Sequence, residues 1–278
     1  MDFDHSAFPY VGPVPSTGEP FLNVEQDGRH AHQSPRGLFW ADEAYADRNV
    51  LLSVPRGFSP NRPVAIVLYF HGNGTVLDRD VIASQAIPEQ LGLSGMNAVL
   101  IAPQMARDAA DSSAGHFWDK DFLSAFLREA SARLADCLHN PHLAAHLDAV
   151  PVIVVAYSGG YNPAAAILRD GGAGGRIAGV ALFDALYAEE DAFAGWAKDN
   201  PQAVLFSAFG KPTRDTSLKL MADLQDQQAH QVQELPPRLI PGDRIFIDLG
   251  DVKHLDLMNG AWIQHPLTQL LRRWPLQR

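Results

Sequence analysis

The chain has 278 residues, of which 46% are hydrophobic and 19% are charged, which suits one α/β domain with a large core. Its formal net charge of -10, with no basic run, argues against a nucleic-acid partner, and no apolar run is long enough for a membrane span. The opening segment lacks the basic and apolar regions of a secretory signal, and a single cysteine, Cys137, excludes an internal disulfide. We therefore expect a cytoplasmic protein in which Cys137 is a buried, inert thiol on a helix.

Residues 1–47 form a first segment that is rich in Pro, Gly and His and has no clear hydrophobic periodicity. Its aromatic side chains favour burial, whereas disordered tails are poor in aromatics, so we expect an arm packed on the domain. His30 and His32 make an H-x-H pair without further ligand-type residues nearby. This pattern predicts solvent-exposed side chains and no metal site.

From residue 48 onward, short apolar runs rich in β-branched residues alternate with helix-like segments. Strands are expected at 48–55, 64–70, 97–103, 150–157, 177–184, 203–209 and 244–250, and helices near 78–93, 119–139, 160–169, 189–199, 214–231 and 259–274. Strands that are apolar throughout are typical of a parallel sheet covered by helices on both faces. The alternation predicts an α/β fold with a doubly wound, mostly parallel sheet over 48–278, with functional residues in the loops at the carboxyl ends of its strands.

Three of those strand ends carry the residue types of nucleophilic catalysis. Ser158 follows the 150–157 strand, Asp184 ends the next one, and His254 follows the last. A serine hydroxyl is a weak nucleophile until a histidine accepts its proton, and the histidine needs a carboxylate to orient it. Ala156 and Gly160 lie two residues before and after Ser158 and are small, as a serine on a strained strand-to-helix turn requires.

The small-x-Ser-x-Gly turn, the upstream "HGNG" at 71–74 and the late His254 resemble the α/β-hydrolase superfamily over roughly residues 48–278. Ala156 stands where the first glycine of this motif is more usual. The resemblance implies that Ser158 is the nucleophile and His254 the base, with no metal or organic cofactor. It also implies that the N–H groups of Gly159 and of Asn73 or Gly74 stabilise the oxyanion, while we expect His71 to brace their loop.

Two aspartates compete for the role of the triad acid. Asp215 lies in the loop after the 203–209 strand, the commoner location in the superfamily that the chain resembles. Asp184 directly terminates an apolar run, so that a rigid strand end would hold its carboxylate at the floor of a cleft. Asp215 suits a helix N-cap or an ion pair equally well. We therefore favour Asp184.

The substrate pocket is less clearly marked. His116 and Trp118 follow the 97–103 strand and Tyr161 follows the serine, so we expect these three residues to bind substrate, with ordinary packing as the alternative. The segment 186–200 is either a short cap or the ordinary helix after its strand. The pattern predicts a serine hydrolase that cleaves a carboxylic ester of a small molecule through an acyl-serine intermediate. The alternatives are a peptidase, amidase or thioesterase with the same triad, or a hydrolase-fold protein that only binds.

Overall fold

The core of the protein is an eight-stranded sheet with the strand order β10-β11-β9-β8-β7-β5-β6-β4. The computed structural model describes residues 1–275. All neighbouring strands run parallel except β4, which pairs antiparallel with β6 at one edge. The expected doubly wound, mostly parallel sheet is confirmed. Its strands are β4 (Val50–Ser53), β5 (Ala65–Phe70), β6 (Ala98–Pro103), β7 (Val152–Tyr157), β8 (Ile177–Phe183), β9 (Val204–Phe209), β10 (His230–Gln231) and β11 (Arg244–Asp248).

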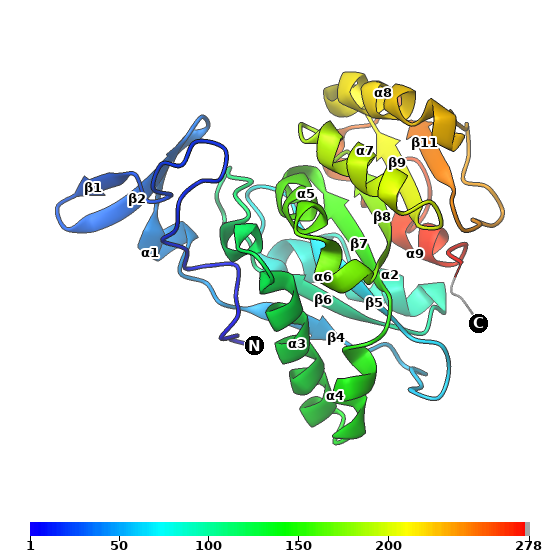
Figure 1. Ribbon diagram of the computed structural model, residues 1–278, viewed down its shortest axis with the longest axis horizontal. Helices are drawn as coiled ribbons and strands as arrows, with labels where there is room; N and C mark the ends of the chain where they lie inside the picture. The colour runs from blue at the N-terminus through cyan, green and yellow to red at the C-terminus, as the bar shows by residue number, and fades with distance from the viewer. Residues whose placement is uncertain (276–278) are drawn as a thin grey trace.

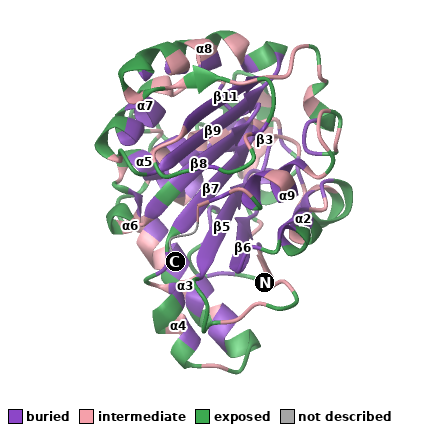
Figure 2. Ribbon diagram, turned by 90° about the vertical axis from the view of Figure 1, so that its right-hand side faces the viewer, coloured by how far each residue is buried: buried purple, intermediate pink, exposed green. Residues whose placement is uncertain are grey.

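The central strands of the sheet are buried on both faces, as their colour in Figure 2 shows, whereas the edge strands β4 and β10 are partly buried or exposed. Successive residues of β5 alternate between two apolar cores, with Ile66, Leu68 and Phe70 in one core and Val67 and Tyr69 in the other. This alternation follows from the two-residue period of a strand. The first core lies under α3 (Phe122–Cys137), α5 (Tyr161–Arg169), α7 (Glu190–Asp199) and α8 (Arg214–Asp223), and the second lies under α2 (Ile87–Ser94) and α9 (Pro266–Leu271).

Several helices are shorter than the sequence pattern predicts. The expected helix 78–93 is a π-helical turn over Leu77–Ser84 followed by α2, because Ala86 between them has a positive φ of 50°. The expected helix 214–231 ends at Asp223, and its last two residues form the edge strand β10. Of the expected helix 259–274, only α9 is regular. In the main domain, the short helix α4 (His142–Leu147) and the turn α6 (Gly172–Gly175), in which Ala173 and Gly174 have positive φ, were not expected.

The arm, residues 1–47, holds a small sheet that the sequence did not reveal. It consists of β1 (Val24–Gln26), β2 (Arg29–Ser34) and β3 (Gly37–Trp40), paired antiparallel and followed by α1 (Ala41–Ala44). In Figure 1 this sheet lies to one side of the main sheet, with the β1–β2 end extended outward. Phe3, Phe8 and Phe21 from the arm are buried in the same core as α3 and α5. Long-range apolar contacts therefore hold the arm against the domain.

The start of the arm is also tied to α3 by Glu129. Its carboxylate accepts hydrogen bonds from the backbone N–H groups of Asp4 and His5, at 2.9 and 2.8 Å. Burial alone would raise the pKa of Glu129, but these donors, with Arg133, outweigh it and lower the pKa to about 2. The ionised carboxylate is thus the form that fastens the arm.

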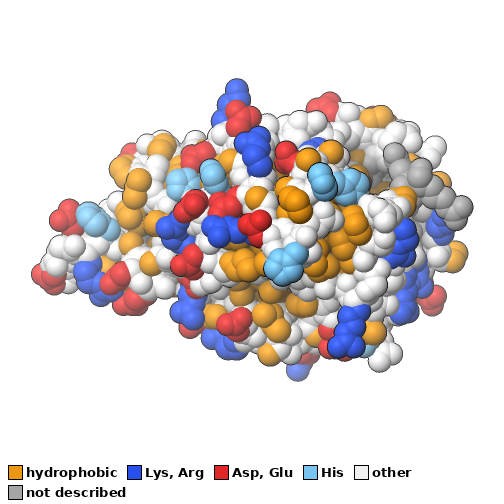
Figure 3. All heavy atoms as spheres, turned by 90° about the horizontal axis from the view of Figure 1, so that it is seen from below, with side chains coloured by type: hydrophobic (Ala, Val, Ile, Leu, Met, Phe, Trp, Pro, Cys, Tyr) orange, Lys and Arg blue, Asp and Glu red, His pale blue; other side chains and the backbone are white. Residues whose placement is uncertain are grey.

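The surface offers no extended field of one sign on the face in Figure 3, where acidic and basic side chains are interspersed. No helix within residues 1–275 is both long and apolar enough to cross a membrane. Cys137 differs from expectation, because it is exposed at the end of α3 and not buried.

Candidate active site

Ser158 occupies a sharp corner between β7 and α5. Its φ of 53° lies in the left-handed region, which non-glycine residues adopt only under strain. Neighbouring glycines permit the close contacts of this corner. A Cβ at Gly160 would lie 2.3 Å from the carbonyl oxygen of Phe70, and one at Gly72 would lie 2.7 Å from the Cβ of Ser158. The chain therefore folds so that the Ser158 hydroxyl is presented above the carboxyl end of the sheet.

A continuous chain of hydrogen bonds joins Asp184, His254 and Ser158. His254 Nε2 lies 2.7 Å from Ser158 Oγ, and His254 Nδ1 lies 2.6 Å from Asp184 Oδ2. The carboxylate is fully buried, whereas the imidazole side chain is 24% exposed. Residues separated by 96 and 70 positions in the sequence thus meet at one point.

Asp184 is held by more than the imidazole. Its other oxygen, Oδ1, accepts hydrogen bonds from the N–H of Gly210, at 3.1 Å, and from the hydroxyl of Thr213. Burial alone would raise the pKa of Asp184, but the hydrogen bonds from His254, Thr213 and Gly210 outweigh it and keep the pKa below its ordinary value. Asp215 is exposed in the first turn of α8, and no hydrogen bond joins it to His254 within the described chain.

Two tyrosines fix the position of His254, and the sequence indicated neither role. The Tyr157 hydroxyl donates to the carbonyl oxygen of His254 at 3.0 Å, and the two rings stack with centroids 5.0 Å apart. Tyr187 meets the imidazole edge-on at 6.1 Å. Burial and the Asp184 carboxylate raise the pKa of Tyr187 to about 12, while Arg36 and a hydrogen bond with Ser158 oppose the rise. The Tyr187 hydroxyl is therefore protonated at pH 7.

The loop 71–75 supplies one candidate oxyanion donor, and Gly159 supplies the other. Within residues 1–275, the backbone N–H groups of Asn73 and Gly159 have no acceptor. The expectation that Gly74 could serve as an oxyanion donor is not met. Its N–H donates to the carbonyl oxygen of Ala109 at 2.8 Å and is therefore not available to an oxyanion. His71 braces the loop, as expected, since its Nε2 accepts from the N–H of Met105 at 2.9 Å. Burial lowers the pKa of His71 to about 4, so its ring is neutral at pH 7.

The side-chain amide of Asn73 connects this loop to the arm. With its nitrogen facing acceptors, it donates to the carbonyl oxygen of Asp111 at 2.9 Å and to Ser112 Oγ at 3.0 Å. Its oxygen then accepts from Arg36 Nη1 at 3.2 Å. A Cβ at Gly159 would lie 2.1 Å from this amide, so Gly159 and Asn73 are packed against each other.

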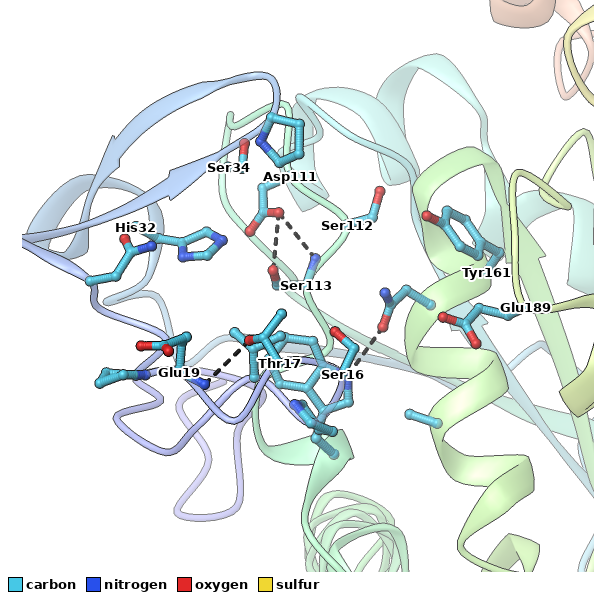
Figure 4. A pocket seen from close by; sticks show the side chains of 18 of the residues that line it. Ser16, Thr17, Glu19, His32, Ser34, Asp111, Ser112, Ser113, Tyr161 and Glu189 are labelled. Carbon is cyan, nitrogen blue, oxygen red and sulfur yellow. Dashed lines mark hydrogen bonds between the residues drawn. The ribbon is translucent and has the colours of Figure 1, made fainter.

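A cleft of about 1030 Å³ lies between the arm and α5 (Figure 4). Ser158 and His254 do not line it, but Ser112 and Tyr161 do, and a Cβ at Gly159 would lie 2.8 Å from Ser112 Oγ. Ser112 therefore lies between the cleft and Gly159, the residue that follows Ser158. Its arm-side wall is made by residues of 14–20 and 32–36, and its other wall by α5 and the segment 110–120.

The three residues expected to bind substrate are placed differently from one another. Trp118 and Tyr161 both line the cleft, and the Trp118 Nε1–H donates to Asn162 Oδ1 at 3.2 Å. His116 is not among the lining residues. Its ring nitrogens lie 2.6 Å from an Asp119 carboxylate oxygen and 2.8 Å from the carbonyl oxygen of Pro9. His116 thus fastens the arm, and packing explains it better than substrate binding.

The remaining sequence expectations concern metal ligands and the segment 186–200. His30 is exposed, as expected. His32 was expected to be exposed but is buried, because its ring stacks on Phe21 and its Nδ1 forms a hydrogen bond with the carbonyl oxygen of Phe21 at 2.6 Å. Residues 1–275 contain no cluster of three or more His, Cys, Asp or Glu residues arranged to hold a metal. The segment 186–200 forms α7, an ordinary helix whose Phe193 and Ala197 are fully buried in the core.

Comparison with known proteins supports the fold. No family model and no curated protein matches the sequence. A feruloyl esterase module from Clostridium thermocellum, solved with sinapinate, covers 98% of this chain and 97% of its own at 11% identity, with a TM-score of 0.50. An S-formylglutathione hydrolase from Agrobacterium tumefaciens matches 86% of this chain and 94% of its own, at 12% identity and a TM-score of 0.44. A fluorophosphonate-binding serine hydrolase from Staphylococcus aureus matches 87% of this chain and 94% of its own, at 11% identity and a TM-score of 0.45.

The strand order, the helices on both faces and the full-length likeness to the esterase module establish that this chain has the α/β-hydrolase fold.

Proposed function

We propose that the protein is a serine hydrolase that cleaves a carboxylic ester, with Ser158 as nucleophile, His254 as general base and Asp184 as the orienting acid. The observation that carries this proposal is the hydrogen-bond chain from the buried Asp184 through His254 to the strained Ser158. In a triad of this geometry, the carboxylate selects the imidazole tautomer that leaves Nε2 free to accept a proton. The likeness of the fold to an esterase module favours an ester as substrate.

The reaction proceeds in two halves. Ser158 Oγ attacks the ester carbonyl carbon while its proton passes to His254 Nε2, and the tetrahedral intermediate then collapses as His254 returns the proton to the leaving alcohol. Water attacks the resulting acyl-serine, again losing its proton to His254, and the collapse of the second intermediate releases the acid and restores the Ser158 hydroxyl. Throughout, Asp184 remains ionised and balances the imidazolium.

The free N–H groups of Asn73 and Gly159 suit the negative oxygen of both intermediates. Asn73 and Gly159 are packed closely against each other, which limits the reorganisation needed when the charge develops. One such donor contributes about 3 kcal/mol to transition-state stabilisation in comparable sites. The contacts of the Asn73 side chain with Asp111 and Ser112 hold its loop in position.

Active-site labelling tests the proposal directly. A fluorophosphonate probe should label the wild-type protein, and Ser158→Ala should abolish both the labelling and the hydrolysis of 4-nitrophenyl acetate. Ser131→Ala is the matched control, because Ser131 is buried in α3 and its hydroxyl has no partner within the described residues. Labelling of Ser158→Ala at the wild-type rate would refute the proposal. If the protein hydrolysed the amide 4-nitroacetanilide as fast as 4-nitrophenyl acetate, it would be assigned as an amidase and not as an esterase.

A further inference from the structure

The arm presents one arginine, Arg36, at the tip of a tight hairpin. Ser34 pairs with Gly37, so that Pro35 and Arg36 alone connect β2 to β3. Ser34 is buried, and its hydroxyl accepts a hydrogen bond from the N–H of Arg36 at 3.1 Å. A proline and a bonded backbone leave this turn little conformational freedom. The turn therefore fixes the backbone of Arg36, while the residue itself is exposed.

The Arg36 guanidinium lies beside the candidate catalytic centre. Its Nη1 is 3.2 Å from the amide oxygen of Asn73, whose own N–H is a proposed oxyanion donor. Its charge also acts on Tyr161 and Tyr187, where it opposes the rise in pKa that burial causes. Arg36 also lines the cleft between the arm and α5.

No carboxylate within residues 1–275 forms an ion pair with Arg36. Three of the acids that line the cleft have other donors, since Asp111 accepts from the Tyr45 and Ser113 hydroxyls, Asp170 from the N–H of Asp121, and Glu189 pairs with Arg169. The fourth, Glu19, lines the arm side of the cleft and forms no ion pair with Arg36 within the described residues. By contrast, Arg29 in the same arm sheet is paired with Asp42 and Glu43. A guanidinium offers five donors in a planar fork that matches a carboxylate, and here most of them are unused.

We propose that Arg36 binds a carboxylate on the acyl half of the substrate, so that the enzyme prefers half-esters of dicarboxylic acids to neutral esters. The choice of half follows from the two sides of Ser158. The leaving oxygen must lie near His254 Nε2, which protonates it, whereas Arg36 contacts Asn73 on the oxyanion side. The inference rests on the proposed function, because it assigns the substrate class of the same site.

The test compares two chromogenic esters with the same leaving group and acyl chain length, the 4-nitrophenyl monoester of adipic acid and 4-nitrophenyl hexanoate. In the wild type, kcat/KM should be about 10- to 100-fold higher for the monoester, the range expected for one charge-assisted hydrogen-bonded pair. Arg36→Gln should remove this preference, mainly through the monoester, and Arg36→Lys should keep part of it. Arg29→Gln removes a paired guanidinium from the same arm sheet and should leave the ratio unchanged.

The outcomes separate this inference from the proposed function. If the wild type is labelled at Ser158 and hydrolyses both esters with similar kcat/KM, or if Arg36→Gln keeps the wild-type ratio, the inference is wrong and the hydrolase assignment stands. If neither labelling nor hydrolysis occurs, the proposed function itself fails. An Arg36-dependent preference for 4-carboxyphenyl acetate over phenyl acetate would place the carboxylate on the alcohol half and overturn the assignment made here.

Discussion

Replacement of Asp184 by Asn is the most informative single change at this site. The amide oxygen takes the place of Oδ1, which accepts from Gly210 and Thr213, because both partners are donors there. The NH2 group must then replace Oδ2 and face His254 Nδ1. Two donors cannot pair, so the imidazole adopts the tautomer with its proton on Nε2. In that form His254 cannot accept the proton of Ser158.

The expected loss in kcat is about 10⁴-fold, as in other triads where the same change imposes the wrong tautomer, and this corresponds to about 5 kcal/mol of transition-state stabilisation. Stability should fall far less. Two of the three hydrogen bonds to Asp184 persist in weaker, uncharged form, so we expect a loss of about 1–3 kcal/mol in the free energy of unfolding. The assay is kcat for 4-nitrophenyl acetate, with urea unfolding measured in parallel.

Asp215→Asn is the matched control. Asp215 is exposed at the start of α8, where its charge interacts with the helix dipole, so its loss should cost about 0.3–1 kcal/mol of stability and leave kcat near the wild-type value. Near-native turnover of Asp184→Asn would refute the reasoning. A large loss of turnover confined to Asp215→Asn would transfer the role of the acid to that residue.

Three further changes probe the packing around the site. Gly160→Ala should destabilise the protein by about 1–3 kcal/mol in urea unfolding, because its Cβ would meet the carbonyl oxygen of Phe70, whereas Gly195→Ala, where nothing lies within 4 Å, should be neutral or stabilising. Glu129→Gln should cost up to about 3 kcal/mol at pH 7. Because the folded pKa of Glu129 is depressed from 4.5 to about 2, this stabilisation is complete above pH 4.5 and is lost as the pH falls from there toward 2, so constant destabilisation across that range would contradict it. Trp118→Ala should alter the preference for acyl chain length more than the melting temperature, and a large loss of stability with unchanged selectivity would assign Trp118 to the core.

The sequence alone was sufficient to locate the main sheet, because its strands are short apolar runs whose pattern depends on local burial. It also indicated the sharp turn at Ser158, since the small residues Ala156 and Gly160 are a local requirement of such a turn. The arm sheet escaped detection because β1–β3 are short and partly exposed, so they carry little hydrophobic periodicity. The expected helices 78–93 and 214–231 are interrupted where Ala86 and Gln228 adopt left-handed backbone conformations, which hydrophobic periodicity does not reveal.

The contacts of the candidate site were decided by the tertiary structure. Asp184 and Asp215 are both plausible acids in the sequence, but only Asp184 faces His254, 70 positions away. In the sequence, Gly74 and Asn73 are equally suitable as oxyanion donors. In the structure, the N–H of Gly74 donates to the carbonyl oxygen of Ala109 and only that of Asn73 remains free among these two. Arg36 lies in a segment without any catalytic motif, and it reaches the site only because aromatic side chains bury the arm against the domain. A sequence records the local preferences of each segment, whereas pairing between distant groups depends on where the packed chain brings them together.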